Sequence, residues 1–145
     1  MLYVDSSALA KRYEREPGGA LLEKRFAQDE LIYSSAIGYA EVHAALARKL
    51  WEQEWTRVEF LQARNRFEVD WLFVREIAVD ADTLAPVSQL VEHLRLRGMD
   101  AIHLAAAVWL QRKTGRAAEF VTTDMRLLAA AQTFGFPAWN PAANA

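Results

Sequence analysis

The stretch MLYVDSSALA, residues 1–10, places one acidic residue between an apolar run and a helical pattern. Residues 2–4 are typical of a strand, whereas Ser6 and Ser7 are typical of a helix start. The stretch therefore predicts a strand, then the carboxylate of Asp5, then a helix. In an open parallel sheet, ligands bind at such strand-to-helix junctions. Asp5 is either a helix cap or the first residue of a binding site, and these ten residues do not decide between the two.

The composition is that of one globular domain, which we expect to span residues 1–145. The chain is 52% hydrophobic and 25% charged, which suffices for a sizeable core and excludes a largely disordered protein. It has no cysteine, so disulfides, zinc–thiolate sites and thiol nucleophiles are excluded. The first residues carry no basic region, and the longest apolar stretch, residues 104–110, is far shorter than the roughly 20 residues of a membrane span. We expect a cytoplasmic protein with no membrane contact.

The overall charge leaves a nucleic-acid partner open. Seventeen basic and nineteen acidic residues give a net charge of −2, which by itself does not indicate binding to a polyanion. Bound divalent metals would neutralise several of these acids and reverse the sign of the total. The local distribution of charge also matters more than the sum.

The rest of the chain alternates between strands and helices. Further strands are predicted at residues 31–33, 73–79 and 120–121, with a short edge strand at 137–140. Helices are predicted at residues 7–15, 20–28, 36–50, 58–71, 80–97, 99–113 and 125–133. Ser34 and Ser35 are expected to cap the third helix, and the helix that starts at Asp80 is expected to contain Pro86 in its early part. This order predicts an α/β fold: a three-layer sandwich with a four- or five-stranded parallel sheet flanked by helices.

Three further acids are predicted to lie near Asp5. Asp124 also follows an apolar strand and precedes a helix, so both aspartates emerge at the same edge of a parallel sheet. Asp100 begins the most apolar helix, where a carboxylate also has a simple capping role. Glu41 lies inside a helix on a face of small residues, where capping does not explain it. The alternative for Glu41 is solvent exposure or an ion pair with Arg48 or the following lysine.

Four clustered carboxylates require protonation or bound cations. Two unit charges about 4 Å apart repel by roughly 4 kcal/mol at an effective dielectric constant of 20. Oxygen ligands of this kind suit Mg²⁺, which Mn²⁺ can replace, better than zinc. Metals between carboxylates indicate phosphoryl chemistry, in which the ions activate a water and stabilise the leaving oxygen.

Four segments together resemble the PIN-domain family, and within it the VapC-type toxins of toxin–antitoxin pairs. They are MLYVDSSAL at the start, SAIGYAEVHAAL after the second strand, RGMDAIHLAAA at the buried helix and FVTTD before the last predicted helix. Each segment is a weak signal alone, but the ordered set covers essentially the whole chain. The resemblance implies a metal-dependent endoribonuclease, usually a homodimer, that hydrolyses RNA by a metal-activated water and is held inactive by a small antitoxin protein.

The resemblance also assigns roles to individual residues. The catalytic and metal-binding quartet would be Asp5, Glu41, Asp100 and Asp124, with Ser6 and Thr122 as supporting hydroxyls. Within this quartet, the first and third acids would be the most direct metal ligands.

Two other functions compete with this hypothesis. A non-catalytic binding module of the same fold would keep the acids only for shape, although unused clustered charge is destabilising. A phosphate-handling receiver or phosphatase-like domain also uses an aspartate after its first strand. That class needs a second acid close to Asp5 and a lysine after the last strand, and neither is present.

Several other residues are of types that often have a catalytic or binding role. His43 and His103 are possible bases, but the metal removes the need for one, and His103 is expected instead to orient Asp100. The Asp80-Ala81-Asp82 segment is better explained by helix capping. Trp51 and Trp55 belong either to a partner surface or to the core. Basic residues that complement helix ends or bind phosphates are Arg12, Arg15, Arg48, Lys49, Arg112, Lys113, Arg116 and Arg126.

Overall fold

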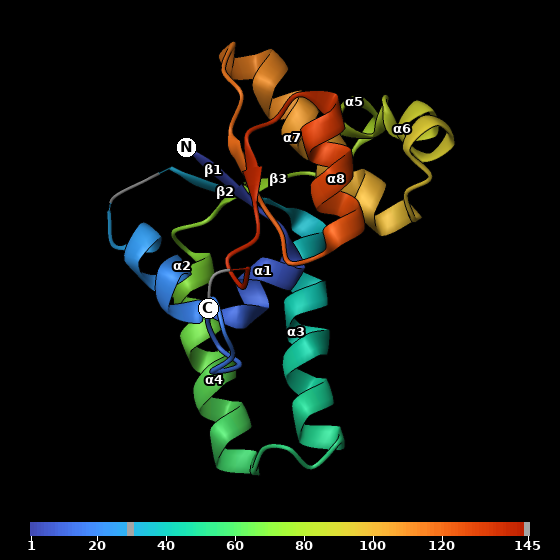
Figure 1. Cartoon of the computed structure of the whole chain (residues 1–145). Coiled ribbons are helices and arrows are strands. Elements are labelled where there is room, and N and C mark those ends of the chain that lie inside the picture. Colours follow the sequence, from blue (N-terminus) through green and yellow to red (C-terminus); the bar gives the residue numbers. More distant parts are fainter. Residues whose placement is uncertain (29–30, 144–145) are drawn as a thin grey trace.

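The computed structural model describes residues 1–28 and 31–143 and has the predicted three-layer architecture (Figure 1). The strands are β1 (Leu2–Val4), β2 (Ile32–Ser35), β3 (Arg75–Ile77), β4 (Glu119–Val121) and β5 (Ala138–Trp139). The helices of the first half are α1 (Ser6–Lys11), α2 (Gly19–Phe26), α3 (Ala36–Trp51) and α4 (Arg57–Trp71). Those of the second half are α5 (Ala81–Leu84), α6 (Val87–Leu94), α7 (Gly98–Thr114) and α8 (Met125–Phe134).

The five strands form one parallel sheet in the order β3-β2-β1-β4-β5, which confirms the predicted fold class. From β1 the chain crosses to β2 on one side, whereas from β4 it crosses to β5 on the other side. The strand order therefore reverses between β1 and β4. At such a point the two outgoing segments separate and leave a crevice at the carboxyl ends of the strands, where α/β proteins bind ligands.

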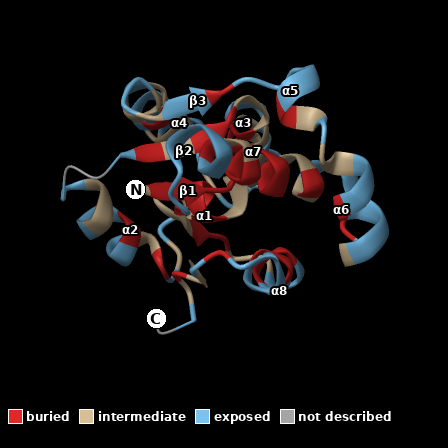
Figure 2. Cartoon of the chain, turned by 90° about the horizontal axis from the view of Figure 1, so that it is seen from above, coloured by how far each residue is buried: buried red, intermediate tan, exposed pale blue. Residues whose placement is uncertain are grey.

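The central strand β1 is buried on both faces, and its alternating side chains divide the core in two. Leu2 and Val4 pack with residues of α1, α2, α3 and α4, whereas Tyr3 packs with residues of α6, α7 and α8. All three side chains are fully buried, and Figure 2 shows β1 in the middle of the molecule. Because successive strand residues point to opposite faces, both helical layers are fixed by this one strand.

Helix α7 is the most buried helix of the second layer. Its first three turns expose little besides Asp100 and its neighbours, and Ala101, Leu104 and Ala105 are fully buried. The small alanine side chains let this helix lie close to the sheet. In the described part of the chain, no helix is both long and apolar enough to cross a membrane.

Two local predictions are wrong. Pro86 separates α5 from α6, so the expected continuous helix over residues 80–97 is broken; proline has no N–H to donate, and its ring clashes with the preceding turn. Ser35 occupies the N-cap position of α3, as predicted, but its hydroxyl makes no capping hydrogen bond, and Ser34 lies one residue earlier in β2. The Ser34 hydroxyl instead donates to the Val4 carbonyl at 2.7 Å and links two neighbouring strands.

Candidate active site

Asp5 ends β1 and is both a helix cap and the centre of a hydroxyl network. Its Oδ1 accepts from the Ala8 N–H at 2.9 Å, and its Oδ2 accepts from the Thr122 hydroxyl at 2.8 Å. The Ser7 hydroxyl lies 2.9 Å from both oxygens, but its single hydrogen serves one of them at a time. One acceptor position of the carboxylate therefore stays open. The residue is only 3% exposed, so that position faces the protein interior or the crevice.

Burial dominates the electrostatics of Asp5. It raises the pKa of this carboxyl above its ordinary value, although the hydrogen bonds from Ala8, Thr122 and Ser7 lower it. A cation beside the carboxylate would offset this cost. Besides the predicted Thr122, the Ser7 hydroxyl also supports Asp5, which the sequence did not predict. The predicted Ser6 hydroxyl bonds to Glu41, another member of the quartet. Ser7 occupies the first turn of α1, where helical side chains lean back toward the cap residue. From this position alone, a contact between Ser7 and Asp5 could have been predicted.

Thr122 and Asp124 extend the network from β4. The Thr122 hydroxyl that donates to Asp5 also accepts from the Asp124 N–H at 3.0 Å. The Oδ1 of Asp124 caps α8 through the N–H groups of Arg126 and Leu127, both at 2.9 Å. Its Oδ2 takes no part in the cap. The ends of β1 and β4 are thus joined by side chains, with one oxygen of Asp124 directed elsewhere.

That oxygen faces Arg97, which lies between two aspartates. The Arg97 guanidinium is 3.4 Å from Oδ2 of Asp124 through Nη2 and 3.4 Å from Oδ2 of Asp100 through Nε. Partial burial raises the pKa of Asp100, and the neighbouring charge of Asp124 raises it further, while Arg97 lowers it. The two carboxylates therefore repel each other and share a cation.

Glu41 is held by a buried histidine. Its Oε1 lies 2.7 Å from Nε2 of His103, whose Nδ1 lies 2.8 Å from the Tyr3 hydroxyl. Within the described ranges, the other partner of that hydroxyl is the Ser35 N–H, which can only donate. The hydroxyl hydrogen therefore goes to Nδ1, and Nε2 carries the hydrogen that is donated to Glu41. The predicted bond from His103 to Asp100 is wrong, because the chain Tyr3–His103–Glu41 uses both ring nitrogens.

Glu41 is consequently ionised at neutral pH. Partial burial raises the pKa of this carboxyl, but the hydrogen bonds from His103 and Ser6 outweigh burial and leave the pKa below its ordinary value. The alternatives of free solvent exposure or an ion pair with Arg48 do not apply.

The donors suit a hard divalent cation, but the described residues do not form a complete cage. Carboxylate and hydroxyl oxygens are the ligands that Mg²⁺ and Mn²⁺ prefer. Asp100 and Asp124 already hold the positive charge of Arg97 between them. Within residues 1–28 and 31–143, no group of three or more histidines and acids is close enough to hold a metal ion unaided. Asp100 and Asp124 are the two acids of the quartet that already face a common positive charge.

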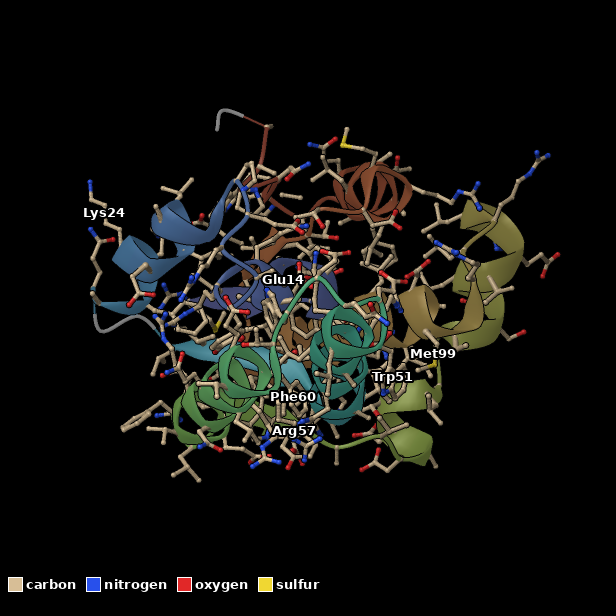
Figure 3. All side chains as sticks on the ribbon, turned by 90° about the horizontal axis from the view of Figure 1, so that it is seen from below. Glu14, Lys24, Trp51, Arg57, Phe60 and Met99 are labelled. Carbon is tan, nitrogen blue, oxygen red and sulfur yellow. The ribbon has the colours of Figure 1, made fainter. Side chains whose placement is uncertain are left out.

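Several other residues singled out in the sequence have partners outside the acidic quartet. His43 packs against Phe67 and lies 2.7 Å from Glu68 of α4. Asp80 caps α5, as predicted, and Asp82 bonds to Trp109 at 2.8 Å. The two tryptophans differ: Trp55 packs against the core, whereas Trp51 at the end of α3 is 74% exposed (Figure 3).

A family model places this arrangement among known proteins. The PIN domain model matches residues 2–132, which include β1, β4 and all four acids. The chain belongs to the PIN domain family. Within this family its relatives are VapC-type proteins, as the sequence resemblance predicted.

Two curated PIN-domain relatives come from Mycobacterium tuberculosis. Ribonuclease VapC49 of strain ATCC 25618 / H37Rv is 32% identical over 108 residues, which cover 74% of this chain and 75% of the relative. Ribonuclease VapC47 of strain CDC 1551 / Oshkosh is also 32% identical, and the match covers 99% of this chain and 98% of the relative.

Solved PIN-domain structures have the same fold at lower identity. FitAcB from Neisseria gonorrhoeae superposes with a TM-score of 0.71 at 18% identity, covering 97% of this chain and 98% of that one. A toxin–antitoxin complex from Klebsiella pneumoniae gives a TM-score of 0.68 at 18% identity, with the same coverage. Mycobacterium tuberculosis VapC20, described as a sarcin-ricin loop cleaving toxin, gives 0.64 at 19% identity and covers 94% and 96%.

Proposed function

We propose that this PIN-domain chain is a Mg²⁺-dependent endoribonuclease and the toxin of a toxin–antitoxin pair. The observation that carries the proposal is the pair Asp100 and Asp124. Both carboxylates contact the Arg97 guanidinium, and Asp124 follows β4, next to the point where the strand order reverses. The ribonuclease names of the curated relatives support RNA as the substrate. We further propose that the protein acts in the cytoplasm, where it meets RNA.

The resemblance implied Asp5 and Asp100 as the most direct metal ligands. Because Asp100 and Asp124 both face the Arg97 guanidinium, we propose instead that these two would hold the metal, with Asp5 and Glu41 completing the site. When bound, Mg²⁺ supplies charge neutralisation at the phosphate and lowers the pKa of a water, so that hydrolysis leaves a 5′-phosphate and a 3′-hydroxyl. Mn²⁺ would substitute for it.

The chain's own residues position this chemistry. His103 fixes the orientation of the ionised Glu41, and Thr122 ties Asp5 to the segment that carries Asp124. Arg97 is 71% exposed, so its guanidinium is free to turn from the two aspartates toward an RNA phosphate.

The partner and the assembly are also part of the proposal. Solved neighbours of the same fold include a toxin–antitoxin complex and FitAB bound to DNA, which supports a small antitoxin as the partner. A homodimer is the expected assembly of the free toxin.

Incubation of the purified chain with total RNA, with and without Mg²⁺, tests the function. We expect new 5′-phosphate ends at defined positions only when Mg²⁺ or Mn²⁺ is present, and no cleavage in excess EDTA. Mapping these ends also identifies the target. Equal cleavage with and without divalent metal, or products with 2′,3′-cyclic phosphate ends, would contradict the proposed chemistry.

A further inference from the structure

A polar groove of about 260 Å³ lies between α1 and α3 and opens beside the acidic site. At one end it is bounded by the Ser6 and Ser7 hydroxyls, Glu41 and Thr123, all part of the site or adjacent to it. At the other end the lining residues are Lys11, Glu14 and Arg48. Glu14, labelled in Figure 3, lies in the turn that follows α1.

The groove is an open, elongated track rather than a closed pocket, because its lining residues recur at helical spacing along α1 and α3. Glu41, Ala45 and Arg48 are four and three residues apart and therefore share one face of α3. Seven residues advance about 10 Å along a helix axis, so the arginine lies roughly two turns from the glutamate. Ala10 of α1 and Ala45 of α3 both line the groove, and these two small side chains leave the space between the ends open.

Arg48 differs from its basic neighbours because it forms no ion pair with any described residue. Lys11 pairs with Glu14 and Glu16, and Lys49 pairs with Glu16 and Glu54. Arg48 makes no hydrogen bond or ion pair with any residue in the described ranges, and its side chain is exposed. An exposed guanidinium with five free N–H donors is suited to phosphate oxygens.

We propose that this groove binds the RNA strand next to the cleavage site, with Arg48 contacting a phosphate beyond the scissile one; the inference rests on the proposed function. The groove leads from the acids that would act on one phosphodiester to an unpaired cation about two helical turns away. A single strand fits a narrow track between two packed helices, whereas a duplex is wider than one such track. The contact binds the backbone and carries no base preference.

Salt-dependent RNA binding tests this assignment directly. We would measure the anisotropy of a short fluorescein-labelled single-stranded RNA with the Asp100→Asn chain, which leaves the RNA intact, and add Arg48→Ala to it. Each phosphate contact to a single strand contributes about 0.7 to the slope of log K against log salt. We expect Arg48→Ala to reduce the slope by about 0.7 and to weaken binding roughly tenfold at low salt.

Arg116→Ala is the matched control, because it removes the same charge from an exposed side chain. Arg116 follows the C-terminus of α7, about 25 Å along the helix from the Asp100 end. Its side chain has no hydrogen bond or ion pair to the described residues, and we expect its loss to leave the slope unchanged. Both arginine side chains are exposed, so we expect each variant to melt at the temperature of the parent chain. Equal melting temperatures would verify that the fold is intact.

Steady-state cleavage by the otherwise wild-type chain gives a second readout. Arg48 would contact the substrate equally in the ground and transition states, so Arg48→Ala should raise KM and leave kcat close to wild type. If the wild-type chain cleaves RNA and Arg48→Ala behaves like Arg116→Ala in slope and KM, the groove is not the RNA track and the proposed function stands. If the wild-type chain cleaves no RNA, both proposals fail.

Discussion

Removal of the Tyr3 hydroxyl tests how the active site is held by the core. The hydroxyl lies 2.8 Å from Nδ1 of His103 and accepts from the Ser35 N–H at 3.2 Å, and all of these groups are buried. Tyr3→Phe keeps the ring, which stacks on Phe120 with 5.1 Å between centroids. The substitution therefore removes two hydrogen bonds and very little packing.

The expected cost follows from the groups left without partners. A buried donor or acceptor that loses its partner costs about 1–3 kcal/mol, so two of them should lower the free energy of unfolding by roughly 2–6 kcal/mol. The variant should still fold, because a domain of this size is stable by about 5–15 kcal/mol. The functional effect should also be large: with Nδ1 released, His103 no longer has one enforced tautomer to present to Glu41. Loss of such a support typically lowers activity by about 10–100-fold.

Urea denaturation followed by tryptophan fluorescence measures the free energy of unfolding, since the chain has five tryptophans. With a slope of about 2 kcal/mol per molar urea, the midpoint should fall by about 1–3 M. Tyr33→Phe is the control: Tyr33 lies on the neighbouring strand, its hydroxyl has no partner among the described residues, and the change should stay within about 0.5 kcal/mol. A Tyr3→Phe midpoint equal to that of the control would refute the hydroxyl bridge. Lost stability with unchanged RNA cleavage would refute its role in orienting Glu41.

Two further predictions concern features outside the acidic site. The hydrogen bonds from Lys11 and Lys49 lower the pKa of Glu16 below 4.5, so this stabilisation is complete above pH 4.5 and is lost as the pH falls through the folded-state pKa. Glu16→Gln should accordingly be less stable than wild type by about 0.5–1 kcal/mol at pH 7, and the two urea midpoints should converge on acidification; a constant difference would exclude the ion pairs as its cause. Thr56→Ala removes one half of the capping box that Thr56 forms with Glu59 at the start of α4, and should cost about 1 kcal/mol in the same assay, whereas an unchanged midpoint would mean that the cap does not stabilise the helix.

The fold was predictable because one strand specifies both helical layers. The run Leu2-Tyr3-Val4 is apolar throughout, and such a strand has to be covered on both faces, as the three-layer structure confirms. The broken helix at Pro86 was the exception. Proline is tolerated in a first helical turn, but Pro86 lies six residues after Asp80, where the predicted helix began. In the structure it follows the four residues of α5 and is the N-cap of α6.

The site was predictable only where chain order fixes it. Asp5 and Asp124 follow neighbouring parallel strands, so their proximity follows from the topology. The hydrogen-bond partner of His103 could not be predicted in this way, because it depends on how α7, α3 and β1 pack in three dimensions. His103 is one turn from Asp100 in sequence but hydrogen-bonds Glu41, 62 residues away. Arg97 likewise joins Asp100, three residues on, to Asp124, and only the first of these contacts is local.

The measurement that tests the central claim most directly is the rate of RNA cleavage by Asp100→Asn, compared with Asp82→Asn in the presence of Mg²⁺. Both substitutions remove one negative charge without changing side-chain volume, but Asp82 bonds to Trp109 and Lys113 on the surface of α7. We predict that Asp100→Asn abolishes cleavage while its melting temperature stays at or above that of wild type, because repulsion with Asp124 is relieved. Asp82→Asn should cleave at the wild-type rate. Wild-type cleavage by folded Asp100→Asn would contradict the claim that these carboxylates form the active site.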